Sequence, residues 1–262
     1  MQGYLKLTSG PVTLAIDPKM GGRIASLTNV GEEILKTSRD ENNWHWGSTV
    51  WVAPQSDWGW PPSTAIDSEP YEVVSADESK IVLKGKVDPE TGYQITKQFE
   101  FNAKSKTPVA TMTYTVHNHG KETRSVALWE NTRVVWDGVT RFPAGTEIRL
   151  DNQAKPIESK EQQGAIAIRF SDTQPDAQKV FCAPPAPEEG KLTWNSYRLG
   201  DLVLTKSRKA PGEVGPGQSP LEIYFGRDGG FAELEYQGAY QELPPGGSSE
   251  LVVLWRLRKV GG

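Results

Sequence analysis

Hydrophobic and polar residues alternate with a period of two along several stretches of the chain. The clearest stretch is residues 93–101, in which Tyr93, Ile95 and Phe99 alternate with polar residues, and residues 109–117 repeat the pattern. Successive side chains of a β-strand point to opposite faces of a sheet, so this alternation is typical of half-buried antiparallel strands. The two stretches therefore predict two long antiparallel strands.

Shorter apolar stretches between glycine-rich and proline-rich turns predict further strands, while amphipathic helical repeats are nearly absent. The adjacent glycines at 21 and 22 precede one such strand and predict positive φ angles or a close approach of another group. About fifteen strands without helices predict an all-β fold, one large antiparallel sandwich over residues 1–262 as a single domain. Besides the two long strands, we expect strands at residues 4–7, 12–16, 23–28, 71–75, 80–85, 124–136, 146–150, 165–170, 191–197, 201–206, 221–225, 231–236 and 249–257.

Residues 44–62 form a stretch that is too interrupted by glycine and proline for a helix and too aromatic for an ordinary solvent-exposed loop. Tryptophan is costly to leave in water, and its N–H group needs a partner when buried. We expect this stretch to pack as a wall that partly faces a ligand, because indole faces stack on the C–H faces of sugars. Two alternatives are a core plug and a homodimer interface. The stretch holds five of the nine tryptophans, at positions Trp44, Trp46, Trp51, Trp58 and Trp60.

The overall composition excludes several classes of protein. With 36% hydrophobic and 24% charged residues, the chain is typical of a globular protein. A net charge of −4 without a basic cluster argues against a nucleic-acid partner. No apolar run approaches the roughly 18 residues of a membrane helix, so no membrane association is expected. The N-terminus has no signal-peptide core, which predicts a cytoplasmic protein, or a periplasmic or secreted one if the chain has been trimmed.

No metal or other cofactor is expected. The single cysteine, Cys182, lies among apolar residues and cannot form an intramolecular disulfide. A buried, inert thiol is the expected state of such a residue. The chain has no histidine and cysteine cluster at zinc-site spacing and no aspartate-rich calcium loop.

Three short motifs, taken in order, resemble the galactose-mutarotase-like superfamily of aldose 1-epimerases and hexose-phosphate mutarotases. The first is MGGRIASL at residues 20–27, whose Gly-Gly-Arg-Ile is shared by one branch of that superfamily. The second is an Asn-x-Gly turn at 118–120 followed by VALWEN at 126–131, and the third is ELE at 233–235 followed by LPPG at 243–246. The resemblance implies a β-supersandwich whose concave face binds a small or oligomeric carbohydrate.

Opening an aldose ring requires a base for the proton of the anomeric hydroxyl and an acid for the ring oxygen. The resemblance implies a carboxylate and a histidine for these tasks, and the carboxylate position corresponds to Glu235. Glu233 lies two residues earlier and therefore on the same face of the strand. The alternative for both residues is a solvated cross-strand carboxylate pair.

The family's histidine is expected within residues 128–133, where this chain has none. His117 and His119 flank a turn, so only His45, in the tryptophan-rich stretch, is a candidate acid; the unperturbed pKa of histidine lies near neutrality. Glu130 is a second candidate replacement, and a Glu130–Glu235 pair would also suit glycoside hydrolysis.

Arginine, amide and aromatic side chains supply the candidate substrate-binding groups. Arg23 and Arg133 could present a fork to a carboxylate or phosphate on a sugar, or form salt bridges within the sheet. The complete set of expected binding residues is Arg23, Trp46, Trp51, Asp57, Trp58, Trp60, Asn131 and Arg133.

Three functions remain open from the sequence alone. The first is a carbohydrate-binding, mutarotase-like protein that interconverts anomers of an aldose or sugar derivative by carboxylate-assisted acid and base catalysis. The second is a sugar-binding protein that lost catalysis together with the histidine. The third is a glycan hydrolase or lyase that uses Glu130 and Glu235 as paired carboxylates.

Overall fold

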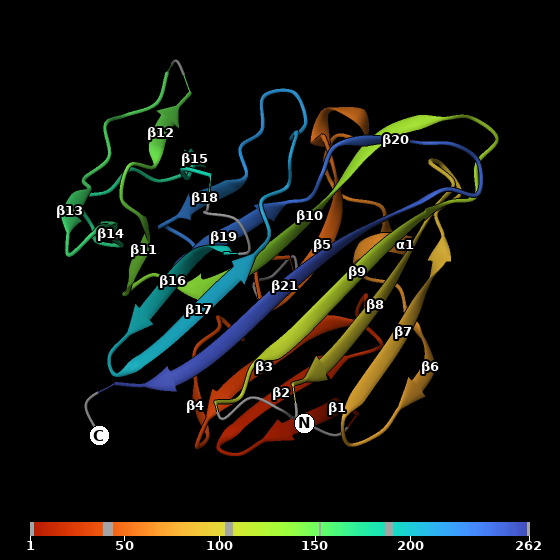
Figure 1. Ribbon diagram of the computed structural model, residues 1–262, viewed down its shortest axis with the longest axis horizontal. Coiled ribbons are helices and arrows are strands. Elements are labelled where there is room, and N and C mark those ends of the chain that lie inside the picture. The colour runs from red at the N-terminus through yellow and green to blue at the C-terminus, as the bar shows by residue number, and fades with distance from the viewer. Residues whose placement is uncertain (1–2, 39–43, 103–106, 152, 187–190, 261–262) are drawn as a thin grey trace.

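Antiparallel strands form two large sheets in the computed structural model (Figure 1), which describes residues 3–38, 44–102, 107–151, 153–186 and 191–260. These residues contain twenty-one strands, the 3-10 helix η1 (Gln55–Asp57) and the one-turn helix α1 (Thr64–Asp67). Neither helix is long and apolar enough to cross a membrane. The expected all-β fold is confirmed.

The first sheet has eleven strands and places β10 and β19 at its centre. Two short strands lie off its main path: β4 (Glu32–Glu33) pairs with β3, and β20 (Gln241–Leu243) pairs with β10. The main path runs in the order β1 (Leu5–Ser9), β2 (Val12–Asp17), β3 (Arg23–Asn29), β5 (Ser48–Ala53), β10 (Arg124–Val135), β19 (Phe231–Gln237), β18 (Leu221–Gly226), β15 (Gln178–Ala183) and β12 (Glu147–Leu150).

The second sheet has ten strands and is built around two long strands, β21 and β9, which Figure 1 shows running diagonally across the molecule. Its order is β13 (Lys160–Gln162), β14 (Ala165–Arg169), β11 (Val139–Pro143), β16 (Thr193–Leu199), β17 (Leu202–Arg208), β21 (Ser248–Lys259), β9 (Ala110–Asn118), β8 (Tyr93–Phe101), β7 (Lys80–Val87) and β6 (Glu72–Ala76).

The hydrophobic core takes one face of each long strand. In β9, Met112, Tyr114 and Val116 are buried, while the threonines between them are partly exposed. In β21, Val253 and Trp255 are buried in the same alternating way. The period-two pattern in the sequence therefore identified the core-facing residues of these strands.

All fifteen expected strands are present, with small shifts at their ends, but six strands were not expected. β4, β13 and β20 are only two or three residues long. β5 is fully buried on both faces, so its sequence does not alternate. β11 and β15 were also missed. The expectation of no helices was wrong at η1 and α1, which are too short to show a helical repeat.

The glycine pair of the early motif makes a close approach, as expected. Gly21 has φ of 64° and Gly22 has φ of 58°. A Cβ atom at Gly21 would lie 1.8 Å from the carbonyl oxygen of Asp67, the last residue of α1. Because no side chain fits there, this turn can pack directly against α1 and hold Asp67 beneath the first sheet.

Candidate functional site

A cavity of about 490 Å³ lies over five neighbouring strands of the first sheet, β5, β10, β19, β18 and β15. At β10 and β19 it is on the face opposite Glu130 and Tyr236, whose side chains contact Lys206 of the second sheet. Its walls combine aromatic rings with ionisable groups. The main lining residues are His45, Trp51, Trp60, Trp129, Lys179, Tyr224, Glu233 and Glu235.

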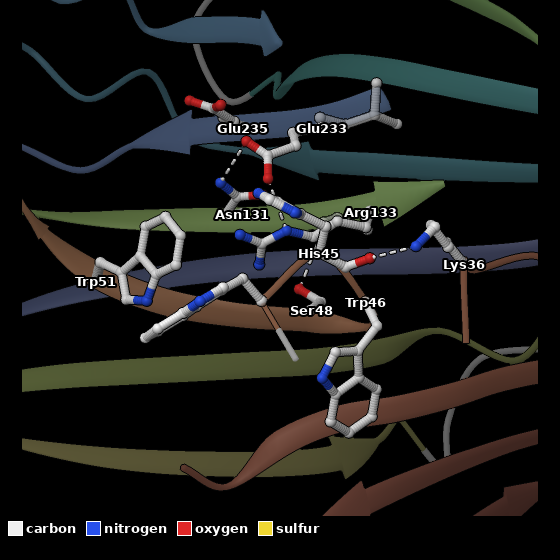
Figure 2. Close-up of polar contacts among 12 residues, drawn as sticks. Lys36, His45, Trp46, Ser48, Trp51, Asn131, Arg133, Glu233 and Glu235 are labelled. Carbon is white, nitrogen blue, oxygen red and sulfur yellow. Dashed lines mark hydrogen bonds and ion pairs between the residues drawn. The ribbon is translucent and has the colours of Figure 1, made fainter. Parts of the chain in front are cut away.

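The antiparallel register of β10 and β19 brings the two carboxyl groups that line this cavity together with two buried polar residues of β10. Asn131 is paired with Glu235, and Arg133 is paired with Glu233. Paired residues in adjacent strands share a face, and residues two apart in one strand do as well. Asn131, Arg133, Glu233 and Glu235 therefore form one polar cluster, which Figure 2 shows.

Glu235 is buried, and only one of its two carboxyl oxygens has a partner. Its Oε2 accepts a hydrogen bond from Trp129 Nε1 at 2.7 Å and lies 2.9 Å from Lys179 Nζ. Its Oε1 has no hydrogen-bond partner within the described part of the chain. Burial raises the pKa of Glu235 to about 8, and the carboxylates of Glu222 and Glu233 add to this effect against the opposing charge of Lys179.

Lys179 enters the cavity from β15 and links two carboxylates. Its Nζ lies 2.8 Å from Glu222 and 2.9 Å from Glu235, and 4.4 Å from the centre of the Trp129 ring. Burial alone lowers the pKa of Lys179, but the two carboxylates outweigh it and raise the pKa above its ordinary value. Sequence reasoning missed both Lys179 and Glu222, because β15 was not expected and neither residue belongs to a recognisable motif.

The pKa of Glu233 is shifted in the opposite direction from that of Glu235. Its Oε1 accepts a hydrogen bond from Arg133 Nε at 2.8 Å, and its Oε2 accepts one from Asn131 Nδ2 at 3.1 Å. Burial raises the pKa of Glu233, but Arg133, Asn131 and His45 outweigh it and lower the pKa. Two carboxyl groups on one strand thus have pKa values moved apart, a pattern found at sites where two carboxyl groups have different roles.

His45 lies close to Glu233 at the cavity, as Figure 2 shows. Its ring stacks on Phe231 at 4.5 Å between centroids, with 16° between the planes. The cluster also retains buried polar atoms without partners among the described residues, namely Asn131 Oδ1 and both terminal nitrogens of Arg133. Asn131 and Arg133 do not line the cavity themselves, and they act on it by holding the lining carboxylate of Glu233.

Three tryptophans surround this polar base. Trp51 and Trp129 are buried, with ring centroids 5.2 Å apart in an edge-to-face arrangement. Trp60 is 51% exposed, and its ring centroid lies 5.9 Å from that of Trp51. Trp60 is therefore the aromatic ring of this cavity with the most free surface for stacking.

Of the expected binding residues, Trp51 and Trp60 line this cavity within the described part of the chain, and the other six do not. Trp46 is buried, and the guanidinium of Arg23 lies 5.2 Å from the centre of its ring. Trp58 donates a hydrogen bond to the carbonyl of Val52 at 2.9 Å and lines two adjacent cavities together with the residues around it. Asp57 is exposed at the smaller of these two, of about 200 Å³.

Both arginines form internal salt bridges, the alternative left open by the sequence. Arg23 pairs with Asp67 at 2.7 Å and also donates hydrogen bonds to the carbonyls of Trp44 and Trp46. Trp51 Nε1 donates to the same Asp67 oxygen at 2.7 Å. Arg23 therefore supports the cavity wall from behind, whereas Arg133 lies in the polar cluster itself.

Glu130 lies on the opposite face of β10 and points between the sheets. Its Oε1 accepts hydrogen bonds from Thr132 and Ser48, and its Oε2 accepts one from Lys206 at 2.7 Å. The residue is fully buried. The expected Glu130–Glu235 pair is not formed, because residues 130 and 131 of one strand face opposite sides and only Asn131 shares the face of Glu235.

Cys182 is buried in β15, and burial raises the pKa of its thiol. This agrees with an inert side chain. Within the described ranges, no group of three or more histidine, cysteine, aspartate or glutamate residues is arranged to hold a metal ion.

Comparisons with known proteins identify both a family and a fold. The family model described as "Domain of unknown function (DUF4380)" matches residues 3–258. No curated protein matches the chain.

Solved structures with similar folds include a galactose mutarotase-like protein from Lactobacillus casei, 13% identical with a TM-score of 0.66, which aligns over 98% of this chain and 100% of its own. A galactose mutarotase related enzyme from Lactobacillus acidophilus is 13% identical with a TM-score of 0.64, over 98% and 97% of the two chains. A galactose mutarotase-like protein from Clostridium acetobutylicum is 12% identical with a TM-score of 0.62, over 97% and 95%. These likenesses show a galactose-mutarotase-like fold and do not carry over an activity.

Proposed function

The chain belongs to the DUF4380 family, and within its galactose-mutarotase-like fold we propose that it binds a carbohydrate and interconverts the anomers of an aldose or sugar derivative. The observation that carries this proposal is Glu235, a carboxyl group whose pKa is raised to about 8 and whose Oε1 is unpartnered at an aromatic-walled cavity. Carboxyl groups with raised pKa values in clefts are typical of acid and base catalysts.

In this proposal the sugar ring stacks on Trp60 and its hydroxyls bind the polar cluster. Glu235 Oε1 removes the proton of the anomeric hydroxyl, and His45 donates a proton to the ring oxygen as the bond between the anomeric carbon and that oxygen breaks. Rotation of the resulting aldehyde and reversal of both proton transfers close the ring as the other anomer. Trp129 and Lys179 hold Glu235 Oε2, so Oε1 is the oxygen that takes the proton.

The remaining charged groups have supporting roles. Glu233, ion-paired with Arg133, stabilises the positive charge that His45 carries before it donates its proton. Asn131 fixes Glu233 through its amide N–H group. The hydrolase alternative loses support, since Glu130 faces away from the cavity and is bound to Lys206.

A second candidate is a sugar-binding protein without catalysis. It is favoured by the ion pair of Glu235 with Lys179, which keeps one oxygen of the proposed base occupied. The two candidates agree on the cavity and on Trp60, and they differ only in whether Glu235 and His45 exchange protons with the sugar.

Proton NMR with a panel of neutral aldoses, uronates and sugar phosphates separates the two candidates. Saturation transfer from protein to sugar reports binding, and exchange between the two anomeric signals reports catalysis in the same sample. The proposal expects accelerated exchange for one class of sugar, lost in Glu235→Gln and His45→Gln. Glu72→Gln and His117→Gln, which alter residues on the second sheet, are matched controls that should leave the exchange rate unchanged.

Binding without faster exchange would favour the second candidate. If no sugar of the panel bound and none showed faster exchange, both candidates would be contradicted.

A further inference from the structure

A buried arginine at the end of β17 stands apart from the site on the first sheet. Arg208 is 3% exposed, and its guanidinium lies 5.4 Å from the centre of the Tyr236 ring. Tyr236 comes from β19 of the first sheet, so Arg208 points from the second sheet into the space between the two. The carboxylates of the sugar cavity lie on the other face of the first sheet.

Arg208 has no carboxylate partner among the described residues, unlike the other buried arginines. Arg23 pairs with Asp67, and Arg133 pairs with Glu233. The Nε and Nη2 atoms of Arg208 are buried and make no hydrogen bond within the described ranges. Burial also lowers the pKa of Arg208 to about 10. Burying an arginine without a partner anion is costly, so a fold that does so leaves room for an anion from outside.

Neighbouring strands add further hydrogen-bonding groups without partners. Thr193 of β16 is paired with Arg208 in register and shares its face, and its Oγ1 is buried without a partner. Trp255 of β21 lies on the same face, across from Lys206, and its Nε1 donor is also unpartnered. The carboxylate whose charge acts on Arg208 is that of Glu130, which Lys206 already binds, so the donors of Arg208, Thr193 and Trp255 remain available to an oxyanion.

Arg208 is one of the residues that line a cavity of about 450 Å³. Its lining includes Lys209, a second cation next to Arg208 in sequence, and the apolar residues Leu192 and Leu251. The one carboxylate in this lining is Glu250, whose side chain is exposed. A cationic base under apolar walls can hold a small molecule that combines an acidic group with an apolar part.

We propose that this cavity binds the carboxylate or phosphate group of a small ligand through the guanidinium of Arg208. The site is distinct from the sugar cavity, and the proposal does not depend on the function assigned there. Lys209, which also lines the cavity, assists as a second positive charge.

Thermal unfolding in sodium phosphate, sodium acetate and sodium chloride at equal ionic strength tests this site. Binding at about ten times Kd should raise the Tm of the wild-type protein by roughly 2–4 °C above its value in chloride. Phosphorus NMR of the phosphate signal provides a direct binding measurement at constant temperature. A phosphate effect larger than the acetate effect would identify a phosphate-bearing ligand, and a larger acetate effect would identify a carboxylate.

Three variants assign the effect. Arg208→Lys keeps the charge but loses the planar fork, so it should fold and lose most of the phosphate response. Arg208→Gln should lose all of it, and Arg208→Lys decides the matter if Arg208→Gln does not fold. Arg169→Gln removes an exposed arginine of the same sheet and should respond as the wild type does. An equal response in Arg208→Lys and wild type, or no response to either anion beyond chloride, would overturn the proposal.

Discussion

Glu130 and Glu235 are both buried at the centre of the first sheet, on opposite faces, and their surroundings differ in one respect. Glu130 has partners on both oxygens, and Lys206 Nζ, which binds it, also donates to Thr132 Oγ1 at 2.9 Å and to the carbonyl of Leu234 at 2.8 Å. Glu235 keeps Oε1 unpartnered at a cavity. A carboxylate whose bonds are all internal can support the fold, and one with a free oxygen can also exchange protons with a ligand.

The largest expected effect separates these roles by activity. Glu235→Gln keeps the shape of the side chain but cannot accept a proton, so anomer exchange should fall about 10²- to 10⁴-fold. Its Tm should not fall, because the substitution removes a buried ionisable group while leaving Trp129 Nε1 an amide oxygen as acceptor. Exchange spectroscopy of the anomeric signals and a thermal scan of the same sample measure both. An exchange rate equal to that of the wild type would place the proton transfers elsewhere.

The next effect distinguishes the roles of Glu130 and Glu235 by stability. Lys206→Met leaves Glu130 buried without its cation and should lower the free energy of unfolding by about 3–5 kcal/mol. Replacing both residues, with Glu130→Leu and Lys206→Met, should restore most of that loss, since no charge is left unpaired. Urea unfolding of the three proteins measures the difference. If Lys206→Met lowered the free energy of unfolding by less than about 1 kcal/mol, the view that Glu130 and Lys206 form a stabilising internal pair would be contradicted.

An effect of similar size is the pH dependence of stability that Glu235 contributes. Its pKa is about 8 in the folded protein, above the ordinary 4.5, so between these values the folded state holds a proton that the unfolded state has released. Stability from this group is therefore full below about pH 4.5 and falls as pH rises toward 8, by about 1.4 kcal/mol per pH unit. Urea unfolding from pH 5 to 8 should show this slope as the difference between wild type and Glu235→Gln. Parallel curves for the two proteins would contradict it.

The smallest expected effect concerns the open rim of the cavity. Trp60→Ala should weaken sugar binding by about 1 kcal/mol, or roughly fivefold in Kd, and change Tm little because the ring is half exposed. Trp58→Ala is a matched control from the same loop that lines other cavities and should leave sugar affinity unchanged. Saturation-transfer titrations report both. A larger loss in Trp58→Ala would move the sugar site to the neighbouring cavities.

The contrast between Glu130 and Glu235 also marks the limit of the sequence. Alternation in residues 124–136 was sufficient to predict β10. Neighbouring residues of a strand face opposite sides, and this parity alone places Glu130 on the other face from Asn131 and Arg133. Grouping all three residues with Glu235 in one site ignored that parity. The placement of Glu233 and Glu235 on one face was correctly predicted by the same rule.

Other parts of the cavity had no signal in the sequence. Lys179 comes from β15, which is short, lies between irregular segments and pairs with β18 and β12 rather than with a neighbour in sequence. Its proximity to Glu235 results from strand order, which composition and periodicity do not encode. The tryptophan-rich stretch was expected to form one wall, but β5 and η1 divide it so that Trp46, Trp58 and Trp60 face different surroundings.

The most direct test of the account is the titration of Glu235 itself, which requires no knowledge of the sugar. Carbon-13 NMR of protein labelled at the glutamate side-chain carboxyl carbons follows each carboxyl group from pH 4 to 9. The account predicts one signal that titrates near pH 8 and is absent from Glu235→Gln. If every glutamate signal titrated below about pH 6, within the usual range for this residue, Glu235 would be an ordinary ion-paired carboxylate and the central claim would be contradicted.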